Sequence, residues 1–342
     1  MTTAFVLPPD VEASAPPEWQ GLQRDEVRLM TVRPSGVAHG RARDLPDLLE
    51  PGDLVVVNTS ATLPARVTAR RADGIAVPLH VSTSLDDGSW VVEVRRPDND
   101  GPDLGAEPST VLTLPGDVRL TLLAGFPDPA RPSRLWRAAA HPAVPTTAYL
   151  PAHGRPIRYG YLRGTFPLSA YQNVYATEPG SAEMASAGRP LTERGIVALV
   201  ARGIPVVPVV LHTGVSSPEL HEPPYPERYA VPEVTARLVT STRRAGRRVV
   251  AVGTTVTRAL ETATGDGGVV RPGSGWTDLV LGPDRPARTV TGLLTGLHAP
   301  EASHLQLLEA VAGADLVEEA YRAAVAERYL WHEFGDAMLF LP

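Results

Sequence analysis

The chain has 342 residues, of which 43% are hydrophobic and 20% charged, a composition typical of a globular protein with a sizeable core. This length exceeds that of most single cores, so we expect two domains, or one large domain with an insertion. The formal net charge of −6 excludes a general cationic field, so a polyanionic partner would have to meet a local cluster of arginines.

The absence of cysteine excludes disulfides, a thiol nucleophile and any zinc or iron–sulfur site with cysteine ligands. The N-terminal residues lack the basic and apolar regions of a signal peptide, and no apolar run approaches 18 residues. We therefore predict a soluble, cytoplasmic protein that makes no membrane contact.

The first expected helix and strand precede residue 59. The stretch RDLPDLLEPGDLVVVN contains a short helix-like piece, a Pro-Gly-Asp turn and an apolar strand over residues 54–57. Asn58 follows this strand directly, so its polar side chain is expected at a strand end.

Residues 67–149 have the pattern of an all-β segment. Short apolar runs with partial alternation, such as SWVVEVR and VRLTLLAG, are separated by Asp-Gly and Pro-Gly-Asp turns. This spacing suits a small barrel or sandwich over residues 67–149. We expect it to be inserted into an α/β main domain, residues 1–66 plus 150–342, in which a mixed sheet or barrel is flanked by helices.

Helices and strands alternate again in the C-terminal half. We expect a helix after Thr192, its candidate N-cap, and then a strand over residues 206–212 in which Pro208 indicates an edge or a bulge. Further helices are expected over residues 232–245, 302–313 and 314–330, and further strands over residues 249–253 and 337–341.

The Gly-Thr-Thr turn in VVAVGTTVTRALET, residues 249–262, lies between an apolar strand and a helix. Such a turn presents free N–H groups and the positive end of the helix dipole, which suits a carboxylate or a phosphate. The turn matches neither GxGxxG nor GxxxxGKS. It could equally be a tight turn in which Thr254 or Thr255 caps the helix, so both interpretations stay open.

Three other local features are candidates for a functional role. Residues 178–188, EPGSAEMASAG, predict a loop, either functional or a simple connector. The nine histidines form no HExxH zinc motif, but His298 could be a base or a hydrogen-bond donor, or could be structural. Asp336 directly precedes an apolar run, and a carboxylate at the edge of a core generally needs a partner.

The chain resembles the S-adenosylmethionine:tRNA ribosyltransferase-isomerase family of queuosine biosynthesis. The matching blocks run in order along nearly the whole chain, and several are long and unusual in composition. They are RDEVRLMTV, RDLPDLLEPGDLVVVN followed by LPARV, YQNVYATEPGS, RRVVAVGTTVTRALET, GWTDLVL, LLTGLHAP and AYRAAVAERYLWHEFGDAML. The resemblance implies an α/β main domain interrupted by a small barrel-like domain.

Members of this family transfer and isomerise the ribosyl part of S-adenosylmethionine onto the 7-aminomethyl-7-deazaguanine base at the wobble position of certain tRNAs. The products are epoxyqueuosine, adenine and methionine. The resemblance therefore implies S-adenosylmethionine and tRNA as partners. It implies no metal and no cofactor, because S-adenosylmethionine is consumed as a substrate. The sulfonium acidifies the carbon next to sulfur, so the reaction needs a base, a grip on the methionine carboxylate and a donor to the departing adenine.

The resemblance suggests roles for residues in the matching blocks. His298 is the leading candidate for proton transfer, and Asp278 is a second, for which a turn-stabilising role is equally open. The candidates for substrate binding are Thr254, Thr255 and Arg258 at the anionic end of the substrate, and Asn58, Gly180, Ser181, Arg328 and Asp336 around the nucleoside.

Several blocks differ from the family pattern. Residues 59–61 read Thr-Ser-Ala where the family usually has Asp-Thr-Arg, and Pro190 stands where a histidine is usual. Residues 213–229 lack the usual Gly-Thr-Phe-Arg, and Tyr225 stands near the position of a second histidine. Glu301 replaces a basic residue that could face tRNA phosphate or the substrate carboxylate.

These differences leave three explanations open. The chain could be a divergent tRNA-modifying enzyme in which other residues replace the lost groups. It could be a paralogue that binds S-adenosylmethionine but uses another acceptor, such as a small molecule, or is non-catalytic; or it could be a structural scaffold. The residues Arg243, Arg244, Arg247 and Arg248 could form a basic patch for tRNA, or merely a solvated helix end.

Overall fold

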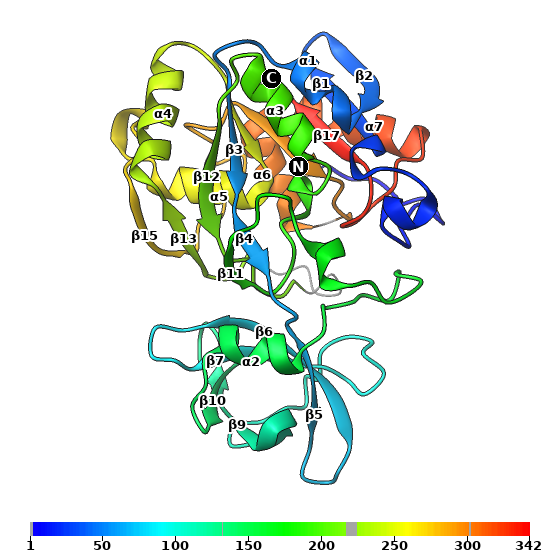
Figure 1. Ribbon diagram of the computed structural model, residues 1–342, viewed down its shortest axis with the longest axis vertical. Coiled ribbons are helices and arrows are strands. Elements are labelled where there is room, and N and C mark those ends of the chain that lie inside the picture. The colour runs from blue at the N-terminus through cyan, green and yellow to red at the C-terminus, as the bar shows by residue number, and fades with distance from the viewer. Residues whose placement is uncertain (1–2, 132, 217–223, 301) are drawn as a thin grey trace.

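The computed structural model of the chain describes residues 3–131, 133–216, 224–300 and 302–342. Helices pack around a large sheet of nine strands. Six further strands close into a barrel, which lies below the sheet in Figure 1. The mixed α/β architecture predicted from the sequence is confirmed. Within the described ranges, no helix combines the length and the apolar character needed to cross a membrane.

Nine strands form the main sheet. Its four central strands β12, β3, β14 and β16 are parallel to one another, and antiparallel pairs extend the sheet on both sides. In sheet order the strands are β15 (Gly273–Thr277), β13 (Glu227–Val231), β12 (Val206–Leu211), β3 (Leu54–Asn58), β14 (Val249–Val252), β16 (Gly292–Gly296), β17 (Ala337–Phe340), β1 (Arg28–Arg33) and β2 (Gly36–Arg41).

Helices cover both faces of the main sheet, because successive side chains of each strand point to opposite faces. In β3, Leu54 and Val56 belong to a core shared with α4 to α7, whereas Val55 and Val57 belong to a core shared with α1 and α3. The helices are α1 (Leu45–Leu48), α2 (Thr146–His153), α3 (Glu193–Ala201), α4 (Glu233–Arg244), α5 (Thr254–Ala263), α6 (Ser303–Ala312) and α7 (Ala314–Ala326).

The barrel has its own apolar core. Alternate residues such as Val67 and Ala69 point inward, and Tyr149 and Leu150 of α2 pack against the same core. Its strands are β5 (Arg66–Arg70), β6 (Ala76–Ser84), β7 (Trp90–Val94), β8 (Val111–Leu114), β9 (Val118–Gly125) and β10 (Leu135–His141). The short runs of alternating apolar and polar residues thus correspond to strands that together close into a barrel.

Details of three elements bear on the sequence predictions. The N-cap role of Thr192 is confirmed, since its hydroxyl accepts a hydrogen bond from Gly195 N at 3.1 Å. The loop predicted over residues 178–188 is wrong at its start, where β11 (Glu178–Ser181) pairs with β4 (Ser60–Thr62). Pro208 lies in the interior strand β12, but β13 pairs only with the last two residues of β12, so no ladder bond is lost there.

Candidate active site

A cavity of about 360 Å³ lies at the carboxyl ends of the central parallel strands, between the main sheet and the barrel. Its walls come from the start of α5, the segment after β16, the first turn of α6 and residues 182–187 and 213–216. Tyr159, Tyr161 and Tyr171 form a further wall. Ligands of open α/β sheets bind at this edge, so the cavity is the candidate active site.

The start of α5 forms one wall of the cavity, through Gly253, Thr254 and Thr255. Gly253 has φ 94° and ψ 162°, a conformation essentially restricted to glycine, and it turns the chain from β14 into the helix. The first N–H groups of a helix have no intrahelical partner, so this end of α5 presents donors and positive potential to the cavity. The arrangement suits an anionic group of a ligand.

Arg258 also reaches the cavity wall, but its donors are engaged within the protein. Its guanidinium is ion-paired with Glu227 and donates to the carbonyl oxygens of Leu279 (3.0 Å), Tyr225 (3.2 Å) and Thr277 (3.2 Å). The side chain is only 5% exposed. Arg258 therefore fixes the wall, while its charge is offset by a carboxylate.

Asn58 lies behind the wall and ties three elements together. Its amide donates to Leu211 O at 2.8 Å and to Thr255 Oγ1 at 3.3 Å, and its Oδ1 accepts from Leu211 N at 3.0 Å. Asn58 is buried and is absent from the cavity lining. It thus positions Thr255 at the start of α5.

Gly180 and Ser181 also lie behind the wall. Ser181 Oγ is 2.6 Å from Ser60 Oγ and accepts from Thr213 N at 3.0 Å, while Ser60 Oγ is 2.7 Å from Nδ1 of His212. A Cβ on Gly180 would lie 2.5 Å from the His212 ring, so only glycine fits there. This cluster anchors the loop that continues into the cavity wall.

Three predicted site residues lie away from the cavity. Asp278 is exposed at the end of β15. Arg328 is exposed and donates to Pro9 O at 2.9 Å. Asp336 is buried and ion-paired with Arg28, whose N and Nε donate to its carboxylate at 2.8 and 2.9 Å. The partner expected for Asp336 is thus Arg28, and the pair ties β1 to the C-terminal segment.

His298 lies on the cavity wall beside a second histidine. Its ring lines the cavity, with Nε2 at 3.0 Å from Thr295 Oγ1, and it stacks on the His304 ring with centroids 4.6 Å apart. Burial lowers the pKa of His298 well below its usual value, and the neighbouring His304 disfavours a second positive charge beside it. Burial likewise lowers the pKa of His304 to about 4. Both imidazoles are therefore neutral at neutral pH, and His298 can accept a proton.

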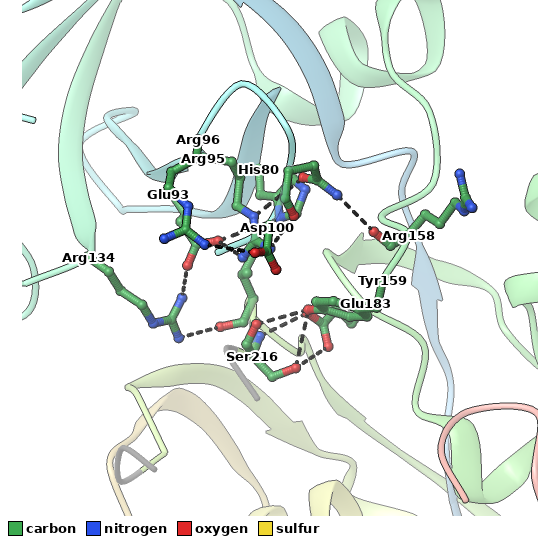
Figure 2. A network of polar contacts seen from close by, with 12 residues as sticks. His80, Glu93, Arg95, Arg96, Asp100, Arg134, Arg158, Tyr159, Glu183 and Ser216 are labelled. Atoms are coloured by element: carbon green, nitrogen blue, oxygen red, sulfur yellow. Dashed lines mark hydrogen bonds and ion pairs between the residues drawn. The ribbon is translucent and has the colours of Figure 1, made fainter. Parts of the chain in front are cut away.

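The opposite wall carries acidic and phenolic groups that the sequence did not single out. Figure 2 shows Tyr159 and Ser216 around the Glu183 carboxylate, with Ser216 N and Oγ donating at 2.9 and 2.7 Å. Next to them, the Tyr161 hydroxyl donates to Glu333, and the Tyr161 ring stacks on the ring of His332. In the sequence, the one sign that Glu183 belongs to the site was its position in the loop over residues 178–188.

A buried ionic cluster connects this wall to the barrel (Figure 2). Glu93 of β7 is ion-paired with Arg95 and Arg134, and Arg134 donates to Val215 O at 3.0 Å. Because a lone buried carboxylate would be costly, the arginines must stay in place. The cluster therefore sets the position of Val215, and with it that of the adjacent Ser216.

Comparison with known proteins shows the family to which the chain belongs. Residues 2–340 match the family model described as queuosine biosynthesis protein. The chain is 36% identical to the S-adenosylmethionine:tRNA ribosyltransferase-isomerase of Thermus thermophilus over 98% of both chains. It is 34% identical to the enzyme of the same name from Thermotoga maritima, also over 98% of both.

The chain belongs to the queuosine biosynthesis protein family. A crystal structure of the S-adenosylmethionine tRNA ribosyltransferase from Thermotoga maritima matches this member of the family with a TM-score of 0.54, at 31% identity and over 99% of each chain. The resemblance inferred from the ordered sequence blocks is therefore confirmed.

The positions where this chain departs from the family pattern lie in different environments. Tyr225 lines the cavity, its ring 5.2 Å from the Arg134 guanidinium carbon. Pro190 is buried and does not line it. Thr59 joins β3 to β4, and residues 60–61 belong to β4 of the small sheet behind the wall. Glu301 and residues 217–223 lie outside the described residues.

The arginines proposed as a basic patch lie at the wrong edge of the sheet. Arg247 and Arg248 precede β14, whereas the cavity lies beyond its carboxyl end. They are also ion-paired, Arg247 with Glu50 at 3.0 Å and Arg248 with Asp53 at 3.2 Å. The sequence left open a basic patch for tRNA or a solvated helix end. The structure supports the solvated helix end, which is remote from the cavity.

Proposed function

We propose that this chain transfers and isomerises the ribosyl part of S-adenosylmethionine onto 7-aminomethyl-7-deazaguanine at the tRNA wobble position, which yields epoxyqueuosine. Support comes from full-length relatives that carry the name of this activity. The observation that carries the proposal is a single cavity shared by a helix N-terminus and a neutral histidine, as the substrate requires. S-adenosylmethionine is then consumed as a substrate, and a tRNA substrate places the protein in the cytoplasm.

In this proposal the methionine carboxylate lies at the start of α5, where Thr254, Thr255 and the first N–H groups surround it. His298 takes the proton from the carbon next to the sulfonium sulfur, and the electron pair of the C–H bond stays on that carbon. Asn58, Gly180 and Ser181 act indirectly, by holding the walls. Arg258 holds the wall that faces the carboxylate.

We also propose that the barrel is an inserted domain. The chain crosses between the sheet and the barrel at β5 and again after α2, and the barrel strands have a core of their own. Since Tyr149 and Leu150 pack in that core, the second boundary is better placed near Gly154 than at residue 149.

The tRNA is proposed to meet arginines beside the cavity. In the segment RPIRYGYLR, residues 155–163, Ile157 and the two tyrosines line the cavity, while Arg155 and Arg163 are exposed. Arg66 pairs with Arg155 through the backbone, and its pKa is lowered by burial and then by the charges of Arg158 and Arg155. Like charges held this close favour a bound polyanion.

The test of the function is an incubation of the pure protein with S-adenosylmethionine, with and without tRNA that carries the precursor base, followed by measurement of adenine and methionine. We expect both products only when that tRNA is present. Release with tRNA that lacks the base, or with a small-molecule acceptor instead, would contradict the proposed acceptor. No release under any condition would contradict the proposed activity.

A further inference from the structure

Glu183 occupies a distinctive position on the cavity wall. It lies two residues after β11, in the loop where the family pattern has a histidine and this chain has Pro190. Its carboxylate accepts hydrogen bonds from the Tyr159 hydroxyl and from N and Oγ of Ser216. These contacts fix the carboxylate, and Glu183 is one of the residues that line the cavity.

The surroundings keep a large fraction of Glu183 protonated at neutral pH. Burial, with a smaller contribution from the charge of Glu333, raises the pKa of Glu183 to about 7, against the hydrogen bonds from Tyr159 and Ser216. A carboxyl group with this pKa is present in both protonation states near pH 7. It can therefore donate a proton under the conditions at which a tRNA-modifying enzyme works.

Among the described residues that line the cavity, the other charged side chains have polar partners. Arg134 is paired with Glu93, and Arg258 with Glu227. Glu333, whose pKa is raised by burial, accepts a hydrogen bond from Tyr161.

The histidines around the cavity are neutral. Burial lowers the pKa values of His298, His304 and His332, although Glu12 acts in the opposite direction on His332. The cavity thus holds a neutral imidazole at His298 and, at Glu183, a carboxyl group that is partly protonated near pH 7. Two ionisable groups whose pKa values are moved apart by their surroundings form the usual arrangement of a base and an acid.

We propose that Glu183, in its protonated form, is the general acid that donates a proton to adenine as it leaves. The glycosidic C–N bond breaks, its electron pair goes to the adenine nitrogen, and that nitrogen takes the proton, which leaves Glu183 as a carboxylate. The amine that attacks the sugar loses a proton on bond formation, and this proton restores the acid. The role rests on the proposed function.

The test is the rate of adenine release in a single turnover, measured against pH for the wild type and for Glu183→Gln. In the wild type, the rate should fall as the pH rises through about 7, because the acid form is lost. In Glu183→Gln the rate should be lower by about 100-fold or more, without this fall, while the Kd for S-adenosylmethionine changes by less than about threefold. Glu318→Gln, on the exposed face of α7, is the matched control and should behave as the wild type.

A second variant tests the role without removing the carboxyl group. The Ser216 hydroxyl lowers the pKa of Glu183, so Ser216→Ala should raise this pKa and move the fall in rate to higher pH. A Glu183→Gln protein with the wild-type rate, or one that keeps the fall near pH 7, would overturn the assignment, as would an unmoved fall in Ser216→Ala. If the wild type itself releases no adenine, the proposed function fails together with this role.

Discussion

His298 and Glu183 line one cavity, and burial acts on their pKa values in opposite directions. For an imidazole, burial penalises the cation and so lowers the pKa, whereas for a carboxyl group it penalises the anion and so raises the pKa. The same physical cause thus leaves one group able to accept a proton and the other able to donate one. The sequence placed His298 in a matching block, but nothing near Glu183 in the chain shows that Tyr159 and Ser216 will surround it.

We predict that His298→Gln lowers the rate of adenine release by about 100-fold or more and leaves the Kd for S-adenosylmethionine nearly unchanged. Because the pKa of His298 is far below 6.5, the imidazole stays neutral until the pH is well below that value. On the acid side, the rate of the wild type should therefore show no fall between pH 7 and pH 6 and should decline only in more acidic solution. An equal loss of rate and of binding would assign His298 to ligand binding or folding instead.

At the level of elements, the turn from β14 into α5 decides where an anion can bind. The β-branched run, the glycine and the helix-forming segment were all readable in the sequence, and both elements are found there. Whether the turn faced a cavity was not readable, because that depends on β16, α6 and the loops around residues 182–187 and 213–216.

We predict that Gly253→Ala costs about 1–3 kcal/mol of unfolding free energy, because alanine is strained at φ 94° and ψ 162°. The added Cβ would also lie 3.3 Å from Ala187 Cβ on the cavity wall, so the affinity for S-adenosylmethionine should fall too. Chemical denaturation and calorimetric titration measure the two effects. Gly273→Ala, with open space around its Cβ position, should cost less than about 0.5 kcal/mol.

At the scale of the whole molecule, the net charge is negative, so tRNA can be attracted only where arginines gather locally on the surface. The sequence indicated residues 243–248, because four arginines lie together there. The fold instead places those arginines at the amino edge of the sheet, and it brings Arg66 from the start of the barrel beside Arg155 and Arg158. In Figure 2 the Arg158 side chain extends away from Glu183, so it does not enter the proposed acid site.

We predict that Arg155→Glu/Arg163→Glu weakens tRNA binding by about tenfold or more at low salt and lowers the slope of log Kd against log salt by about two. The matched control, Arg243→Glu/Arg244→Glu, makes the same change of charge on the remote helix end and should bind tRNA as the wild type does. Both proteins should keep the wild-type affinity for S-adenosylmethionine. Equal loss of tRNA binding in the two variants would point to net charge rather than to the proposed surface.

The sequence by itself determined the family, the alternation of helices and strands and the run of short strands over residues 67–149, because these depend on local periodicity and on ordered blocks. It also located His298 and the start of α5, each carried by a block of its own. Only the tertiary structure decided that Asp278, Arg328 and Asp336 lie away from the cavity and that Glu183 lies in it. Burial, pairing and pKa are properties of neighbours brought together by folding, and the distance along the chain does not reveal them.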